Sequence, residues 1–486
     1  MSSISALSNW QPAVRYQPQP ASRSNAPAGS SPSSPSTVVK LSPEALAAAS
    51  EPLTAAARYK DLGAAMLNQF TTGGPVPVKH DELPAGLDNQ FSLSIVTRSG
   101  TKVDLTLANV DDGMIFQVSA SADLSDDERK ALARLAGGFQ SAIDGLAQGE
   151  PQVRLAALTR IDSKFLESVD FHAEVRQGSA PSERQVLDFH IDGKQRKVSL
   201  NGPSGQAEVS VDTATLESLG SKEQQARAIN NYLKQFDQAA LRGHGDARLM
   251  SMFKDAFSDM NRTSSRAEAA DTGLSTEKKW TLSSEEHAVL SGLSDFSASI
   301  TQTPKFSNPL KLAETDTFAY EVSQNTSVSG ERRDDRAIAQ AQKASLKAQY
   351  HLSLKGDAEP KLDIDPNSQN YQYRQIDDSA SSNVELGYKD GRLVRATLEQ
   401  SVNQSERIRK YVLGRMTADN TVPAQQTLVR DLMSTLAPYR AGENGNAREE
   451  SSAARDERRQ LSLDSLNGNM LLLSNPFELK ARDQAW

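Results

Sequence analysis

Strict alternation of apolar and polar residues constrains this chain more than any other feature of its sequence. Three alternating runs follow one another at 91–95, 103–107 and 116–120, with short polar segments between them. A period of two is the pattern of a β-sheet with one buried face. The stretch therefore predicts three short strands in a meander.

The segment after this meander has helical periodicity instead. Ser125 and Glu128 have the spacing of a capping box, in which each side chain satisfies a backbone N–H at the start of a helix. The apolar stripe that follows consists of Leu132, Leu135, Phe139, Ile143 and Leu146. We expect an amphipathic helix that covers the open face of the meander, so that 91–148 forms one unit.

The same plan recurs along the chain. In 168–211, alternating runs flank Asp192-Gly193, a dipeptide that favours a tight hairpin. Ser221 and Gln224 repeat the capping-box spacing before a helix. The third, looser copy at 346–436 has its hairpin signal at Asp390-Gly391. Further expected elements are helices at 247–260, 284–293 and 424–436, a strand at 317–328, and a short exposed helix or hairpin tip at 331–344.

These patterns predict an α+β fold, with antiparallel β-meanders each covered by amphipathic helices, in two domains. At 486 residues the chain is too long for one ordinary core. The predicted parts are a disordered leader at 1–37, an N-terminal α+β domain at 38–261, a linker at 262–282, a C-terminal antiparallel β-rich domain with a closing helix at 283–439, and a linker and tail at 440–486. An apolar patch in that tail, 470–473, is expected to dock on its own domain.

The leader is rich in Ser, Pro, Ala and Gln, and the first acidic residue is Glu44. Such a segment buries too little apolar surface to offset its ordering entropy, so we expect it to be disordered. Ser-rich, acid-poor leaders are also typical of bacterial type III export substrates, although a plain flexible tail is the simpler interpretation. The chain has no cysteine, which excludes disulfides and thiolate chemistry.

Charge and hydropathy exclude several classes of partner. A formal net charge of -8 disfavours nonspecific binding to nucleic acid, and we expect none. No window approaches the roughly 18 apolar residues of a membrane span, and the first residues lack the pattern of a cleavable signal peptide. We expect a soluble protein that is either cytoplasmic or exported without such a signal; the sequence does not indicate its oligomeric state.

Two histidines are the best metal-ligand candidates. His172 and His190 each close an Asp-Phe-His triplet in neighbouring predicted strands, and Asp192 follows two residues after His190. Two imidazoles and a carboxylate could hold a metal ion. The alternative, which alternation favours, places both histidines on the solvated face opposite Phe171 and Phe189. We therefore assign no metal, cofactor or catalytic residue.

Other motifs fail in their details. Asp363, Asp365 and Asn367 begin like a calcium loop, but Ser368 replaces the required Gly and Arg374 replaces the bidentate Glu. The segments 202–205 and 243–246 lack the context of a nucleophile elbow or a phosphate loop. Asp377 and Asp378 are expected to be solvated strand ends rather than a pair of catalytic carboxylates.

The leading functional hypothesis is a non-enzymatic bacterial interaction or structural protein, which binds a protein partner of unknown identity. Long, polar-faced strands in the C-terminal region suggest it, because strand edges can pair with another chain. Two alternatives stay open: an exported effector or surface-associated protein that uses the Ser-rich leader, and an enzyme whose site is assembled from distant residues.

Overall fold

Antiparallel strand pairing links almost every part of the chain that the structure describes. The computed structural model describes residues 55–72, 86–110, 113–178, 183–213, 219–262, 282–330, 332–356, 358–440 and 452–485. The predicted leader at 1–37 and nearly all of the predicted linker at 262–282 lie outside these ranges. Those two predictions therefore stay predictions.

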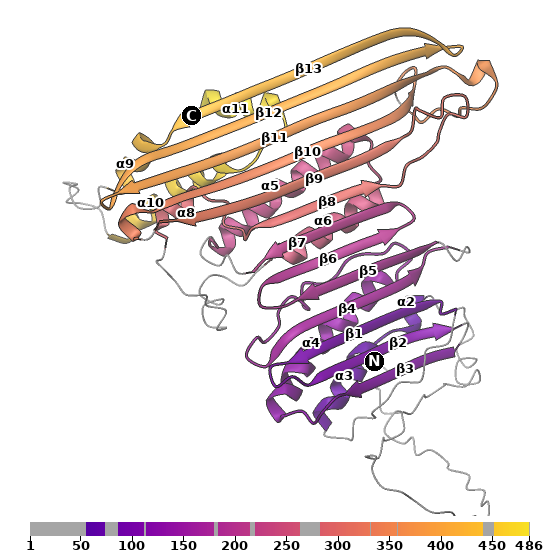
Figure 1. Ribbon diagram of the computed structural model, residues 1–486, viewed down its shortest axis with the longest axis vertical. Coiled ribbons are helices and arrows are strands. Elements are labelled where there is room, and N and C mark those ends of the chain that lie inside the picture. Colours follow the sequence, from indigo (N-terminus) through magenta and orange to yellow (C-terminus); the bar gives the residue numbers. More distant parts are fainter. Residues whose placement is uncertain are drawn as a thin grey trace, which may run out of the picture. The chain divides into compact units, whose positions relative to one another are not determined.

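One 13-stranded sheet runs through these residues (Figure 1), in the order β13-β12-β11-β10-β9-β8-β7-β6-β5-β4-β1-β2-β3. Apart from the β4–β1 contact, each strand lies beside its neighbours in sequence. The strands are β1 (Asn89–Thr97), β2 (Lys102–Val110), β3 (Gly113–Ala120), β4 (Leu166–Arg176), β5 (Arg184–Ile191), β6 (Gln195–Gly202), β7 (Gly205–Asp212), β8 (Phe296–Gln302), β9 (Thr317–Ser329), β10 (Ala337–Ser353), β11 (Tyr371–Lys389), β12 (Arg392–Val412) and β13 (Arg415–Asp431).

Helices lie on one face of this sheet (Figure 1). The predicted capping box at Ser125 and Glu128 is confirmed, and all five residues of the predicted stripe are buried. The helices are α2 (Ala55–Arg58), α3 (Leu62–Asn68), η1 (Gln69–Thr72), α4 (Asp126–Leu146), α5 (Lys222–Gly243), α6 (Ala247–Asn261), α8 (Ser284–Ala288), η3 (Arg333–Asp335), η4 (Pro366–Ser368), α9 (Met433–Arg440), α10 (Ser452–Met470) and α11 (Pro476–Ala485).

Alternation determines the strand register. Leu93 on β1 faces Leu105 on β2 and Phe171 on β4, and all three side chains are at most 1% exposed. A slip of one residue would turn this row to solvent, so burial of one face fixes the pairing. The predicted α+β class with antiparallel strands is therefore confirmed.

The sheet does not break at the predicted domain boundary. β7, from the predicted N-terminal domain, pairs with β8, from the C-terminal one, along Gly205 to Val211. By their contacts, the described residues on both sides of this boundary belong to one compact unit. The division into two domains stays a prediction. Backbone hydrogen bonds between β7 and β8 join the two predicted domains.

Several predicted elements in the C-terminal half are wrong. The predicted helix at 424–436 is mostly strand β13, and α9 begins only at Met433. The predicted helix or hairpin tip at 331–344 contains η3 and the first half of β10. The predicted linker after 440 contains helix α10 from Ser452 onward, and the predicted helix at 284–293 shortens to α8. Strand β8 was not predicted.

A row of polar side chains crosses the helix-covered face, where alternation requires apolar ones. Gln324, Gln342, Ser382 and Gln400 are direct cross-strand neighbours on β9 to β12, and each is at most 2% exposed. A buried amide or hydroxyl is costly unless it forms hydrogen bonds. The row therefore requires polar groups to lie across it.

The C-terminal segment supplies those groups for three of the four side chains, whereas Gln324 Nε2 donates to the Leu293 and Ser294 carbonyls. Gln342 Nε2 and Ser382 Oγ donate to the Met470 carbonyl over 3.1 and 2.8 Å. Gln400 Nε2 donates to the Asn469 carbonyl over 3.1 Å, and the Leu472 N–H donates to Gln342 Oε1 over 3.0 Å. The apolar patch at 470–473 thus docks on its own chain, as predicted.

Replacing Gln342 should destabilise this arrangement. In Gln342→Leu, the Leu472 N–H and the Tyr232 hydroxyl, which also donates to Gln342 Oε1, lose their buried acceptor. We expect the free energy of unfolding in urea to fall by about 3 kcal/mol. Lys347→Leu, at an exposed position on the same strand, should change it by less than about 0.5 kcal/mol. Equal effects of the two substitutions would contradict the role of the row.

Candidate functional site

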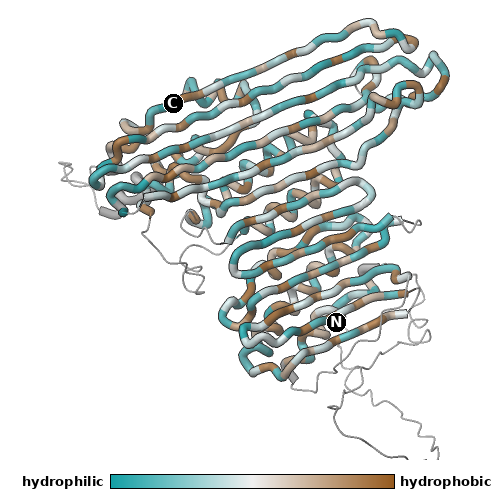
Figure 2. The backbone as a smooth tube through the Cα atoms, in the orientation of Figure 1, coloured by the Kyte–Doolittle hydropathy of each residue, from teal (hydrophilic) through white to brown (hydrophobic). Residues whose placement is uncertain are grey.

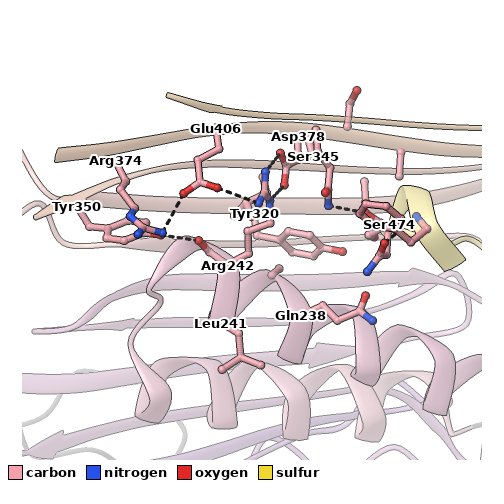
Figure 3. Close-up of a pocket in the computed structure, with 18 residues that line it drawn as sticks. Gln238, Leu241, Arg242, Tyr320, Ser345, Tyr350, Arg374, Asp378, Glu406 and Ser474 are labelled. Atoms are coloured by element: carbon pink, nitrogen blue, oxygen red, sulfur yellow. Dashed lines mark hydrogen bonds and ion pairs between the residues drawn. The ribbon is translucent and has the colours of Figure 1, made fainter. Parts of the chain in front are cut away.

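A cavity of about 450 Å³ lies between the end of α5, strands β9 to β12 and the segment before α11. Its wall combines apolar groups with two arginines and two carboxylates (Figure 3). Leu241 and Phe477 line it too and are 84% and 76% exposed. Among the described residues, this cavity gathers charged side chains from the most distant parts of the sequence.

The charged groups form a chain of ion pairs. Arg242 donates through Nη2 to Asp378 Oδ1 over 3.0 Å, and its Nη1 lies 3.7 Å from Glu406 Oε2. Glu406 Oε1 accepts from Arg374 Nη1 over 3.0 Å. Figure 3 shows Arg242 between the two carboxylates. Each cation in the cavity wall is thus matched by a carboxylate.

This pairing limits the chemistry of the cavity. The Tyr350 hydroxyl donates to the Arg242 carbonyl over 3.0 Å, and burial raises the pKa of that hydroxyl. The two carboxylates that line the cavity, Asp378 and Glu406, are separated by Arg242. They therefore form no acid–base pair. The geometry favours a structural role for these four charges.

Asp378 corrects one prediction. It is 9% exposed, lies within β11 and pairs with Arg242 from α5, so it is not a solvated strand end. Sequence reasoning missed the cavity because its charged residues lie far from their partners in the sequence, from 32 positions for Arg374 and Glu406 to 136 for Arg242 and Asp378 and more for Arg242 and Glu406. The sequence signal that could have indicated the cavity was Asp378. It is a charged residue at a position of an alternating strand where an inward-facing side chain is expected.

A second polar cluster lies on the opposite face, where the connection 303–316 between β8 and β9 covers the end of β10 to β12. Glu314 Oε2 accepts from the Tyr371 hydroxyl and Oε1 from the Tyr411 hydroxyl, both over 2.7 Å. His351, 1% exposed, lies between Glu314 and Asp316, with ring nitrogens 3.6 and 2.5 Å from their oxygens. We call these five residues the Glu314 cluster.

Glu314 and His351 in this cluster have shifted pKa values. Burial alone would raise the pKa of Glu314, but the nearby His351 ring and hydrogen bonds from Tyr371 and Tyr411 outweigh it and lower the pKa to about 2. Burial would lower the pKa of His351, but its contact with Asp316 and the nearby Glu314 carboxylate raise it. The cluster therefore holds an ionised carboxylate and favours a protonated imidazole.

The candidate metal ligands His172 and His190 each contact different carboxylates. His172 Nδ1 lies 2.7 Å from Asp188 Oδ1, while His190 lies 2.7 Å from Asp170 through Nδ1 and 3.3 Å from Asp192 through Nε2. Because the two carboxylates occupy opposite sides of the His190 ring, the three groups do not converge on one point. In the described ranges, no group of three or more such ligands is arranged to hold a metal ion.

The remaining sequence motifs are turns. Gly202 pairs with Gly205 to close the β6–β7 hairpin. His244 adopts a left-handed conformation, with φ of 56°, as the C-cap of α5. Asp363 and Asp365 accept hydrogen bonds from backbone N–H groups one turn ahead. Each motif is explained by local backbone structure.

β13 is the most exposed structural feature of the sheet. It has 17 residues, pairs with β12 along one side, and has no described strand on the other. The Leu432 N–H donates to the Ala396 carbonyl over 2.8 Å, in continuation of the β12–β13 register. Alternate residues of an antiparallel strand direct their backbone groups to the same side. Between Ala418 and Asp431, where the register is unbroken, even-numbered residues therefore bond to β12, and odd-numbered ones face the free edge.

Comparisons with protein-family models, with curated proteins and with solved structures gave no significant match. None of the described helices is long and apolar enough to cross a membrane. Functional inference for this chain therefore depends on its own geometry.

Stability should depend on pH through the Glu314 cluster. Glu314 contributes stability above its ordinary pKa of 4.5, and this is lost as the pH falls towards 2. His351 contributes stability below its ordinary pKa of 6.5, and this contribution is lost as the pH rises through its raised pKa.

We expect Glu314→Gln to lower the free energy of unfolding at pH 7 by about 3 kcal/mol and to weaken the loss of stability at acidic pH. Glu399→Gln, at an exposed carboxylate, should do neither.

The metal hypothesis has its own test. Because Asp170 and Asp192 hold the ring nitrogens of His190, we expect elemental analysis of purified protein to find no stoichiometric metal. His190→Ala should give the same result. Metal that is bound by the unmodified protein and lost in this variant would establish the predicted site.

Proposed function

We propose that this chain is a non-enzymatic interaction protein that binds an extended segment of a partner protein along β13. The observation that carries the proposal is the free edge of this 17-residue strand. Unpaired N–H and C=O groups on a sheet edge are a template for a further strand. The edge belongs to 283–439, the region predicted as a separate C-terminal domain.

The exposed part of β13 directs several backbone N–H and C=O groups to its free side. Gln425, Thr427 and Val429 are exposed and, by the register of the ladder, direct N–H and C=O outward. On the helix side, Leu428 is 1% exposed and anchors the strand. The edge is therefore held in place while its outer groups stay accessible, which favours strand addition over local fraying.

Pro423 restricts where a partner can pair. It falls in the odd-numbered set, so its missing N–H is on the free side and no bond to β12 is lost. A proline at this position prevents one continuous ladder along the whole strand. We infer that a partner pairs with 425–431, and that Pro423 discourages open-ended stacking of copies.

The other edge of the sheet is a poorer template. β3 has eight residues against 17 in β13. Its residues Met114 and Ile115 are 4% and 5% exposed, whereas Val422 and Val429 on β13 are 57% and 68% exposed. Length and accessibility both favour β13 as the interaction edge.

Proline substitutions test the proposal without touching the β12 ladder. Gln425→Pro/Thr427→Pro removes two outward N–H donors, and Gln425→Ala/Thr427→Ala is the matched control. In pull-downs from the native host, we expect a partner retained by the unmodified protein and by the alanine variant, and reduced at least about tenfold with the proline variant. Circular dichroism and urea unfolding check that both variants fold.

Hydrogen exchange gives a second measurement. The amides of Gln425, Thr427 and Val429 should exchange rapidly in the free protein and become protected in the complex. Recovery of no specific partner would count against the proposal. Equal capture by the proline and alanine variants would reject strand addition while leaving another binding mode.

A further inference from the structure

Exposed apolar side chains are concentrated at one end of the sheet. Of the 14 large hydrophobic residues that are exposed in the described parts of the chain, eight lie on three connections at this end. They are Phe306, Leu310, Leu312, Leu354, Ile364, Val412, Leu413 and Met416. We call this end, formed by 303–316, 354–370 and 410–416, the apolar tip.

The three connections of the apolar tip are in contact. Asn308, on the first, donates to the side chains of Gln369 and Tyr371 over 2.9 and 3.1 Å. The Gly414 N–H, on the third, donates to the Gln369 carbonyl over 2.9 Å. Figure 2 shows hydrophobic positions where these connections turn beyond the strands. The three connections therefore form one end of the sheet, and all eight side chains lie at that end.

The Glu314 cluster fixes the first connection of the apolar tip to strands β11 and β12. Tyr371 and Tyr411, on two different strands, both donate to Glu314 on the first connection. Lys311, from the same connection, places Nζ 3.3 Å from the centre of the Tyr411 ring. Apolar residues such as Phe306 and Leu312, 70% and 66% exposed, are thus presented on an ordered base.

The exposed side chains surround the end of the sheet. Met416 pairs with Tyr411, whereas Val412 pairs with Arg415, so Met416 and Val412 lie on opposite faces. A single flat protein surface would meet only one of these faces. A medium that surrounds an inserted tip, such as the outer layer of a lipid bilayer, meets both.

Charge at the apolar tip differs from that of the whole chain. Its three segments contain six Lys and Arg and six Asp and Glu in the sequence, so they carry no formal net charge. Among their exposed described residues, the cations are Lys305, Lys355, Lys361, Lys410 and Arg415, and the anions are Glu359, Asp363 and Asp365. The complete chain has a net charge of -8. Lysine and arginine beside exposed apolar groups favour anionic lipid headgroups, with an attraction of about 1 kcal/mol for each cation near the surface.

We propose that the apolar tip is a membrane-surface site that inserts its apolar side chains among anionic lipids. The site is separate from the pairing segment 425–431 of β13 and goes beyond the interaction function proposed above. It requires no membrane-spanning segment, because interfacial binding depends on buried apolar area and electrostatic attraction.

Vesicle co-sedimentation of the full chain tests the proposal. The probes are phosphatidylcholine vesicles and vesicles of equimolar phosphatidylcholine and phosphatidylglycerol. The tip variant is Phe306→Ser/Leu312→Ser/Ile364→Ser. The matched control is Leu241→Ser/Val394→Ser/Leu461→Ser, which changes three exposed apolar residues outside both the tip and β13.

We expect the unmodified protein and the control variant to bind anionic vesicles, with weaker binding to neutral ones, and the tip variant to lose at least about tenfold in affinity. Added salt should weaken binding. Absence of binding to anionic vesicles, or equal binding by the tip and control variants, would overturn the proposal. If the tip variant keeps vesicle binding but loses a protein partner, the site is a protein interface and the lipid assignment is wrong.

Discussion

The antiparallel backbone ladder is the interaction on which the rest of this structure depends. It joins 13 strands from both halves of the chain into one sheet, including the contact between β7 and β8. The ladder fixes which side chains are neighbours, and therefore places Gln324, Gln342, Ser382 and Gln400 in one buried row. It also leaves unpaired backbone groups along β13. Its internal rows of buried side chains stabilise the protein, and its free edge at β13 is the proposed binding site.

Alternation predicted the first half of the sheet well, because each strand there buries apolar residues on one face only. The turns at Asp192-Gly193 and Asp390-Gly391 and the capping box at Ser125 and Glu128 were equally visible, since they are local. The helix predicted at 424–436 was wrong because Leu428, Leu432 and Leu436 are four residues apart. That spacing fits one helical face and also one face of a strand. Here tertiary pairing with β12 keeps the chain extended to Asp431, so that only Leu436 lies in a helix.

The candidate sites were harder to predict. Gln340 and Gln342 interrupt the apolar face of β10, so its first half lacked a strand pattern. Their inward positions make sense only once distant groups are present: Ser291 for Gln340, and Met470 and Leu472 for Gln342. The cavity and the Glu314 cluster likewise join residues from separate strands and connections. No local pattern encodes such contacts, whereas the exposed edge of β13 follows from its position as the last strand.

The docked C-terminal segment has a consequence for the order of folding. Nearly every strand pairs with its neighbour in sequence, so most of the sheet can grow by successive hairpins with short loops to close. The segment at Met470 instead reaches Gln342, 128 residues earlier. Closing so large a loop is entropically costly and slow, and it follows formation of the strands that carry the polar row. During synthesis, Gln342, Ser382 and Gln400 would stay without these hydrogen-bond partners until residues 469–472 emerge, whereas Gln324 has the earlier Leu293 and Ser294 carbonyls.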